Sequence, residues 1–206
     1  MYIAPRNKLD EVMAICKEWE QITQFELEHE YFEAFYQYAV NDYIGVYKGY
    51  SETHDPKLIK TKGLFLTEVT LGKGMAPQII AQALQEYFVN KVPIYETIHN
   101  CQDIRKFLTY QKVKKEFSVE YNGKLIPHIN RYYMSRNGSH LFRCTVDPQT
   151  GFRSNYSNLC ATSGVTIFNE LKDISPKDAN INYLWYQTEA NKIVYALEES
   201  LNPTLF

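Results

Sequence analysis

Long hydrophobic runs are missing from this chain of 206 residues. No apolar stretch approaches the roughly 20 residues that a helix needs to cross a bilayer, so we expect no transmembrane helix. The N-terminal residues Met1–Pro5 also lack a charged region followed by an apolar one, which argues against a signal peptide. We therefore expect a soluble protein of the cytoplasm with no membrane partner.

Motifs that carry their own chemistry are also missing. The four cysteines are far apart and form no C-x-x-C pair, so reduced thiols are expected in place of a zinc site, and His99 with Cys101 is the nearest approach to a ligand pair. The glycines at 72 and 74 lack the spacing of a phosphate-binding loop, and no G-x-S-x-G elbow is present. The sequence thus indicates no self-contained catalytic site.

Charge is distributed unevenly along the chain. The net charge of −2 and the pI of about 6.2 argue against a free-standing nucleic-acid binder, which is usually basic. Lys and Arg nevertheless cluster in residues 57–63 and 105–115, whereas residues 10–33 are acidic. A neutral total can therefore hide a basic face. The 17 tyrosines fit either an aromatic core or a surface on which nucleic acid stacks.

The spacing of apolar residues predicts an α+β fold. Helices are expected over residues 9–24, 77–90, 94–100, 103–114 and 181–199. Strands are expected over residues 2–4, 25–28, 43–47, 58–67 and 165–171, while 31–40 fits both periods and 147–164 is loop-like. The strands at 43–47 and 58–67 are expected to form an antiparallel hairpin with a long loop. A domain boundary is expected at residues 71–77, where Gly and Pro interrupt the pattern.

Two Asn-Gly pairs predict β-hairpins, because both residues tolerate positive φ. Asn122-Gly123 lies at the centre of residues 116–126, and Asn137-Gly138 lies within residues 130–145. Each pair is therefore expected to connect two antiparallel strands.

Lysines and carboxylates on the expected strands are the candidates for binding and catalysis. Lys60 and Lys62 point to the same face of a strand, where a shared phosphate would stabilise two repelling ammonium groups; the alternative is a solvated face. Glu26 and Glu28 share a face that fits a solvated edge better than a metal site. Asp42, at a strand entrance, fits a cap or turn as well as a catalytic acid.

The order of these segments resembles the C-terminal part of a family B DNA polymerase, especially those of bacteriophages. Val40–Ile44 (V-N-D-Y-I) is similar to the K-x-Y segment of that family, and Ile59–Gly63 (I-K-T-K-G) to its I-K-x-K-G segment. Ile129–Tyr133 (I-N-R-Y-Y) looks like a thumb strand with an R-V-x-Y pattern. The helix from Pro77 and the closing helix over 181–193 match the first and last thumb helices. The resemblance covers nearly the whole chain.

The resemblance implies a partial palm subdomain over residues 1–70 and a thumb subdomain over residues 71–206. The palm part would contain antiparallel edge strands with a helix, and the thumb would mix helices and hairpins. The implied function is to grip primer–template DNA during phage DNA replication. Backbone contacts of this kind are independent of sequence and weaken with salt. The residues implied in DNA contacts are Tyr43, Lys60 and Lys62 at the primer strand, and Arg131 and Tyr132 in the thumb.

The chain also departs from the family. Asn41 replaces the lysine of the K-x-Y segment, and the catalytic motifs D-x-x-S-L-Y-P and Y-G-D-T-D-S are absent, as is the exonuclease domain. Met1–Pro5 would directly follow the turn that carries the metal-binding aspartates. We therefore expect Mg²⁺ and dNTP to bind only in the complete nucleotidyltransferase. This chain, as a split-gene subunit or a truncated product, is expected to bind no cofactor and to be inactive alone.

Partners other than DNA follow from the same resemblance. The remaining part of the polymerase is one implied partner. The C-terminal residues Leu205 and Phe206 resemble the tails that dock on bacterial sliding clamps, although a frayed terminus is the alternative. Two other functions stay open, namely a non-catalytic protein-interaction module that retains the thumb fold and an independent enzyme with a site of its own.

Overall fold

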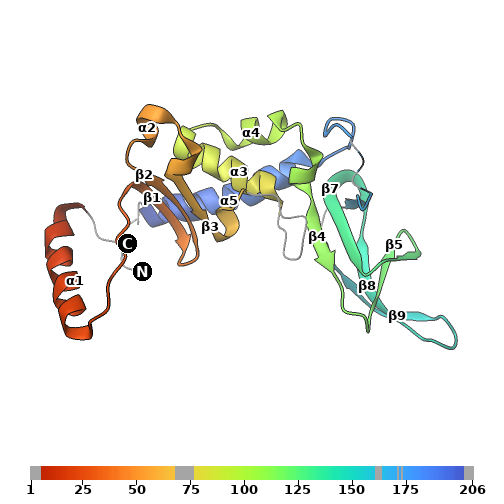
Figure 1. Ribbon diagram of the computed structural model, residues 1–206. Coiled ribbons are helices and arrows are strands. Elements are labelled where there is room, and N and C mark those ends of the chain that lie inside the picture. Colours follow the sequence, from red (N-terminus) through yellow and green to blue (C-terminus); the bar gives the residue numbers. More distant parts are fainter. Residues whose placement is uncertain (1–5, 68–76, 161–163, 171, 173, 202–206) are drawn as a thin grey trace. The chain divides into compact units, whose positions relative to one another are not determined.

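The structure is a computed structural model that describes residues 6–67, 77–160, 164–170, 172 and 174–201 (Figure 1). The described residues form α-helices and three antiparallel sheets, which confirms the expected α+β class. No helix among them is long and apolar enough to cross a membrane. The strand expected at 2–4 and the proposed clamp-binding residues Leu205 and Phe206 lie outside the described residues.

The chain divides into two compact units. The N-terminal unit comprises Met1–Phe35 and Gly45–Lys60, and the C-terminal unit comprises Tyr36–Ile44 and Thr61–Phe206. This division differs from the single boundary expected after residue 70, which falls among residues that the structure does not describe. Strands close in sequence thus belong partly to one unit and partly to the other.

The described part of the N-terminal unit begins with a 3₁₀ turn, Arg6–Lys8, followed by helix α1, Leu9–Thr23. The helix ends at Gln24, whose backbone is left-handed with φ of 59°. The strand expected at residues 25–28 is wrong. The Leu27 amide donates a hydrogen bond of 2.7 Å to the Glu20 carboxylate of α1, so this segment follows the helix instead of entering a sheet.

A three-stranded sheet has the order β1-β2-β3, with β1 at Phe32–Ala39, β2 at Asp42–Tyr47 and β3 at Ile59–Lys62. The ambiguous segment 31–40 is therefore a strand, and the expected neighbours at 43–47 and 58–67 lie side by side. A short helix, α2 at Tyr50–Thr53, and a 3₁₀ turn at Pro56–Leu58 lie between them.

The last strand of this sheet is shorter than expected, because a 3₁₀ turn at Gly63–Phe65 follows Lys62 directly. Gly63 has a φ of +62°, and a Cβ there would overlap Asp42 and the Asn41 carbonyl. Asp42 accepts a hydrogen bond of 2.8 Å from the Leu64 amide. Asp42 is therefore a cap for this turn.

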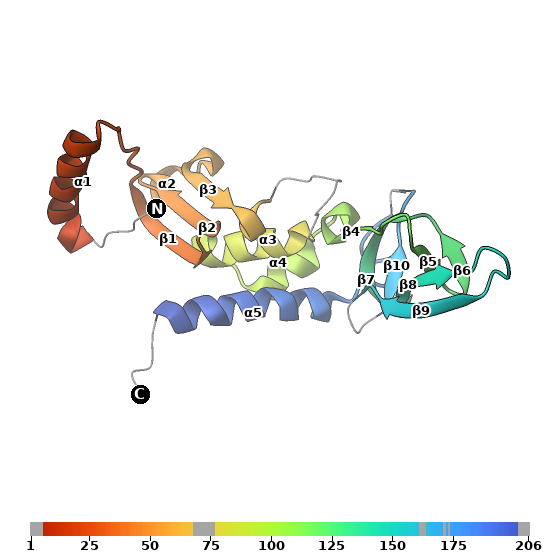
Figure 2. The ribbon, with the colours of Figure 1, turned by 90° about the horizontal axis from the view of Figure 1, so that it is seen from below.

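Three helices of the C-terminal unit pack together: α3 at Gln78–Gln85, α4 at Ile94–Asn100 and α5 at Tyr183–Leu201 (Figures 1 and 2). A π-helical turn at Glu86–Asn90 extends α3. All three confirm the expected helices. Their apolar faces, with those of neighbouring segments, form the core, in which the large side chains that are fully buried include Ile79, Leu84, Ile98, Phe107 and Tyr186.

The helix expected over residues 103–114 is wrong. A 3₁₀ turn at Ile104–Phe107 is capped by Asp103, which accepts a hydrogen bond of 3.0 Å from the Arg105 amide, and strand β4 follows at Thr109–Lys112. Ile104 and Phe107 are both buried, so one turn satisfies the apolar spacing that suggests a longer helix. The residues after it pair with β7 instead.

Two further sheets complete the C-terminal unit. The first has the order β10-β7-β4, with the long strand β7 at Ile129–Ser139 between β4 and β10, Val165–Ile167. The second has the order β6-β5-β8-β9. Its strands are β5 at Ser118–Tyr121, β6 at Lys124–Ile126, β8 at Leu141–Val146 and β9 at Arg153–Asn158. Strand β9 lies in a segment expected to be a loop.

Only one of the two expected hairpins forms. Asn122 and Gly123 connect β5 to β6 with φ of 52° and 72°, as expected. Strand β7, however, runs through Asn137 and Gly138, and β8 pairs with β5 and β9. A Cβ on Gly138 would overlap the backbone of Val165. This glycine therefore allows a close approach of two strands instead of a turn.

Candidate nucleic-acid interface

Two of the five residues implied in DNA binding are buried. The side chain of Tyr43 in β2 is 5% exposed and that of Tyr132 in β7 is 3% exposed. Burial raises the pKa of Tyr132 to about 12. These two rings have little surface for a nucleic acid and act in the core.

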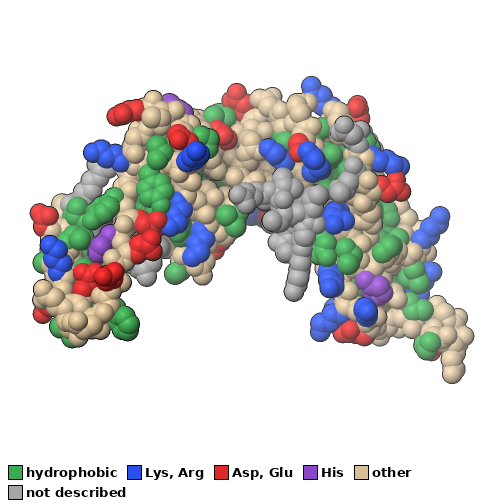
Figure 3. Space-filling model, in the orientation of Figure 1, with side chains coloured by type: hydrophobic (Ala, Val, Ile, Leu, Met, Phe, Trp, Pro, Cys, Tyr) green, Lys and Arg blue, Asp and Glu red, His purple; other side chains and the backbone are tan. Residues whose placement is uncertain are grey.

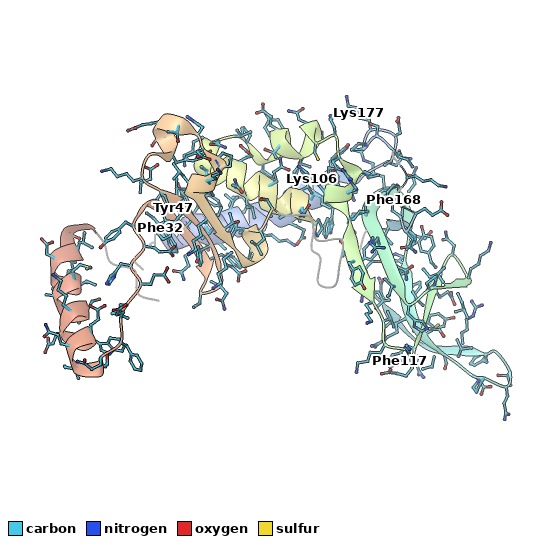
Figure 4. All side chains as sticks on the ribbon, in the orientation of Figure 1. Phe32, Tyr47, Lys106, Phe117, Phe168 and Lys177 are labelled. Atoms are coloured by element: carbon cyan, nitrogen blue, oxygen red, sulfur yellow. The ribbon has the colours of Figure 1, made fainter. Side chains whose placement is uncertain are left out.

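Lys60, in the N-terminal unit, already has an anion within the chain. Its Nζ lies 2.6 Å from each carboxylate oxygen of Glu30, and the Tyr47 hydroxyl donates a third hydrogen bond to the same carboxylate at 2.6 Å. These hydrogen bonds, that of Lys60 first, hold the pKa of Glu30 below its ordinary value. The aromatic pair of Phe32 and Tyr47, with ring centroids 4.7 Å apart, lies beside this cluster (Figure 4).

Lys62, two residues along β3 and in the C-terminal unit, is exposed. The sequence suggests that Lys60 and Lys62 share a phosphate. For Lys60 the anion is instead Glu30, which compensates its charge within the chain. No spacing in the sequence indicates this ion pair, whose partners are 30 residues apart. Lys62 stays a candidate phosphate contact.

Arg131 lies at the centre of a small surface on the β4–β7 pair. Its guanidinium carbon is 5.7 Å from the centroid of the Tyr110 ring, within the range of a cation–π contact. Tyr110 and Arg131 are direct partners across the two strands, as are Lys112 and Ile129. Because alternate residues of a strand share a face, all four side chains belong to one face. We call these four residues the β4–β7 face.

The β4–β7 face is open at one end and closed at the other. Lys112 is exposed and Ile129 is 42% exposed, whereas Tyr110 and Arg131 are half-buried. Further along the same face of β7, Tyr133 is buried and packs edge-on against Phe168, with ring centroids 5.9 Å apart. The open end therefore combines a lysine, an arginine and an aromatic ring on one face of the sheet.

The backbone behind the β4–β7 face is held by the side-chain amides of Asn130 and Asn169. The Arg131 amide donates a hydrogen bond of 2.7 Å to Asn169 Oδ1, and the Asn169 side chain donates one of 3.0 Å to Asn130 Oδ1. Asn130 is fully buried and also donates a hydrogen bond of 2.6 Å to the Pro127 carbonyl. This network holds the strand that presents Arg131.

The surrounding chain is strongly basic. Residues 104–153 contain ten basic and three acidic residues, a net charge of +7. Figure 3 shows Lys and Arg side chains over the strands of this region. The basic residues here that the structure shows as exposed, apart from Arg105 beside Asp103, are Lys112, Lys114, Lys115, Lys124 and Arg136. A polyanion would meet a positive potential along this part of the chain.

Some of these basic residues have structural partners. The Arg153 guanidinium lies 2.8 Å from Glu120, and Arg143 stacks 4.5 Å from the centroid of Phe117 (Figure 4). Lys106 donates a hydrogen bond of 2.8 Å to Gln82. Such residues stabilise the fold, which leaves the exposed lysines and Arg131 as the candidate anion contacts of the region.

The resemblance implied Arg131 in DNA contacts, but sequence reasoning did not select Tyr110 and Lys112, which share its face. Both lie in the segment expected to be a helix, where they would have pointed in different directions. An available signal was the alternation of Tyr110 and Lys112 with Thr109 and Gln111, which suits a strand.

No metal centre is evident in the part of the chain that the structure describes, where no group of three or more potential ligands gathers. His99 stacks on Tyr183 with ring centroids 4.6 Å apart, and the Cys101 thiol donates to the Asp103 carbonyl. Burial raises the pKa of Cys101, which disfavours a metal-binding thiolate. Glu26 and Glu28 are both exposed and lie outside any described strand.

No protein-family model matches the chain, and no curated protein or solved structure is detectably similar to it.

Proposed function

We propose that this chain binds primer–template DNA, as the palm-edge and thumb part of a phage-type family B DNA polymerase. The observation that carries the proposal is the β4–β7 face, where Arg131 and Lys112 flank the Tyr110 ring within a segment of net charge +7. Support also comes from the order of the segments that resemble that family.

The residues have different roles in the proposed DNA binding. Lys112 and Arg131 contact phosphates of the duplex, and Tyr110 lies against sugar or base, since an aromatic ring accepts any sequence. Lys62 provides a further phosphate contact at the end of β3. Tyr43 and Tyr132 act by packing beneath these surfaces, and Lys60 acts through its ion pair with Glu30.

The proposal includes no metal chemistry in this chain. The catalytic motifs of the family are absent from the sequence, so Mg²⁺ and dNTP would bind to the remaining part of the polymerase. Primer extension by this chain alone, with magnesium and all four dNTPs, would contradict this part of the proposal.

Fluorescence anisotropy with a labelled primer–template hairpin at 50 mM NaCl tests the binding. The variant Lys112→Glu with Lys114→Glu should bind at least about tenfold more weakly, because both exposed cations contact or approach phosphates. The variant Lys177→Glu with Lys192→Glu is the matched control. It changes the net charge equally, at exposed positions outside residues 104–153, and should bind within about twofold of wild type.

Two results would overturn the proposal. One is no anisotropy change with the wild-type chain at 50 mM NaCl. The other is an equal loss of affinity in the two variants, which would show that net charge alone matters. A single-stranded template of the same length should bind more weakly than the duplex, since a polymerase thumb grips the duplex product.

A further inference from the structure

Helix α1 carries large apolar side chains on its surface. None of its described side chains is buried. Ile15, Trp19 and Ile22 are 60%, 43% and 74% exposed, and Leu9 is 39% exposed. Isolated apolar residues on a surface are ordinary, but Ile15, Trp19 and Ile22 occur at the i, i+4 and i+7 positions of one helix face. That spacing is the one by which a helix anchors in a groove.

The apolar stripe continues beyond the helix. Phe25 is 68% exposed, and its ring stacks on Trp19 with ring centroids 6.2 Å apart. The left-handed backbone of Gln24 and the hydrogen bond from Leu27 to Glu20 hold this arrangement. Trp19 and Phe25 therefore form a fixed aromatic end to the stripe, so little entropy is lost when a partner covers it.

Carboxylates border the same stripe. Glu11 and Glu18 lie one helical turn before Ile15 and Ile22, which places each acid beside an isoleucine. Both glutamates are exposed, and Glu11 lies 4.0 Å from the Lys8 ammonium group at the start of the helix. Over residues 9–33 there are eight acidic residues and one lysine, a net charge of −7. In Figure 3, hydrophobic and acidic side chains lie next to each other over α1 and the segment that follows it.

We propose that α1 docks into an apolar groove, rimmed by Lys or Arg, on a partner protein. The charge of the helix decides the class of partner. Nucleic acid and anionic membranes are repelled by the carboxylates, and interfacial helices that bind such membranes carry Lys and Arg instead. A second copy of this chain would bring two acidic rims together. The helix is about 22 Å long at roughly 1.5 Å per residue, which suits a single groove.

A synthetic two-helix hairpin peptide with a leucine-lined groove and a lysine rim serves as the probe. Isothermal titration calorimetry with the full chain at 50 mM NaCl should show binding at least about tenfold tighter than to the same hairpin with a glutamate rim. The difference should shrink at 500 mM NaCl, because salt screens exposed charges. Equal binding of the two hairpins, or no binding of either, would overturn the proposal.

Two pairs of substitutions locate the binding surface. Ile15→Ser with Ile22→Ser should weaken binding of the lysine hairpin at least about tenfold. The matched control is Leu184→Ser with Tyr195→Ser in α5, whose side chains are 68% and 65% exposed, and it should bind as wild type does. Undiminished binding by the α1 variant would contradict the proposal.

A charge reversal keeps the test decisive if the serine variant unfolds. Glu11→Lys with Glu18→Lys retains the apolar stripe and should prefer the glutamate hairpin. An unchanged preference would overturn the role of the rim.

Analytical ultracentrifugation tests whether a second copy of this chain covers α1 instead. A wild-type dimer that becomes monomeric in the variant Ile15→Ser with Ile22→Ser would assign the face to a second copy. DNA binding through the β4–β7 face is measured separately. Neither Ile15→Ser with Ile22→Ser nor Glu11→Lys with Glu18→Lys should affect it.

Discussion

Individual tyrosines in this chain have distinct tasks that depend on their burial. Tyr186 in α5 is fully buried, and its hydroxyl accepts a hydrogen bond of 2.9 Å from the Met134 amide and donates one of 2.8 Å to the Phe107 carbonyl. It thereby ties the closing helix to β7 and to the turn before β4. Tyr110, which is half-buried beneath Arg131, is the tyrosine we assign to binding.

Removing the Tyr186 hydroxyl should destabilise the fold. Tyr186→Phe leaves the Met134 amide and the Phe107 carbonyl without these hydrogen bonds in a dry interior, at a cost of about 1–3 kcal/mol in the free energy of unfolding. Urea denaturation measures it. Tyr195→Phe, at a position 65% exposed, is the control and should change stability by less than about 0.5 kcal/mol. Equal effects of the two variants would refute the role of Tyr186.

Glu30 should make stability depend on pH. Lys60 and Tyr47 lower its pKa in the folded chain from the ordinary value of 4.5. A carboxyl with a lower pKa in the folded state stabilises the fold above pH 4.5, and this contribution is lost as the pH falls through the folded pKa. The partners' side chains are 39% and 33% exposed, so solvent screening limits the contribution to less than about 1 kcal/mol.

Glu30→Gln should therefore lose less stability than wild type between pH 7 and pH 3. Urea denaturation at several pH values gives the comparison, and a double-mutant cycle with Lys60→Met isolates the pair. Its coupling energy should be largest at pH 7 and should decrease as the pH falls below 4.5. A coupling energy that stays constant across this range would show that the ionisation of Glu30 does not stabilise the chain.

At the scale of elements, the same Asn-Gly dipeptide has two different roles. Gly123 has a φ of +72° at the tip of a hairpin, and a Cβ there would meet nothing within 4 Å. Gly138 lies inside β7, where a Cβ would overlap the Val165 backbone. The first glycine is required by backbone conformation and the second by the distance between two strands.

This difference predicts unequal costs for alanine. Gly123→Ala should destabilise the chain by about 1 kcal/mol, since only the left-handed backbone is strained. Gly138→Ala should cost about 2–3 kcal/mol, because neighbouring backbone must shift. Thermal and urea unfolding of both variants provide the measurement, with Gly151→Ala, another open position with φ of +70°, as the control for Gly123. A smaller effect at Gly138 than at Gly123 would contradict the close strand approach.

Elements with long apolar periodicity could be predicted from sequence, and polar or compact ones could not. The helices over 9–23 and 183–201 have faces that repeat over several turns. Strand β9 (R-S-N-Y-S-N) has no buried residue, so no alternation marks it. The segment containing Ile104 and Phe107 suggests a helix because one buried 3₁₀ turn has the same spacing.

The candidate site shows the same limit. Arg131 follows from the resemblance of its segment to a thumb strand, but Tyr110 reaches it only through the register of two strands 21 residues apart. The pairing of Lys60 with Glu30 likewise depends on tertiary contact. Sequence patterns therefore indicated the candidate strand that contains Arg131 but not the strand that pairs with it.

Across the whole molecule, charge is segregated between the units. The N-terminal unit has ten acidic and six basic residues, a net charge of −4, and the C-terminal unit has 14 acidic and 16 basic residues, a net charge of +2. Within them, residues 9–33 carry −7 and residues 104–153 carry +7. This segregation is compatible with the two proposals, in which a chain of net charge −2 offers one surface to DNA and another to a protein.

Photocrosslinking from the β4–β7 face tests the central claim most directly. Tyr110→p-benzoylphenylalanine, irradiated with labelled primer–template, should crosslink to DNA. Tyr195→p-benzoylphenylalanine, on the exposed side of α5, is the matched control and should give only background. The expected result is a labelled protein–DNA product from position 110 that disappears when NaCl is raised to dissociate the complex. The contradicting result is an equal or stronger product from position 195, or none from position 110 while anisotropy shows bound DNA.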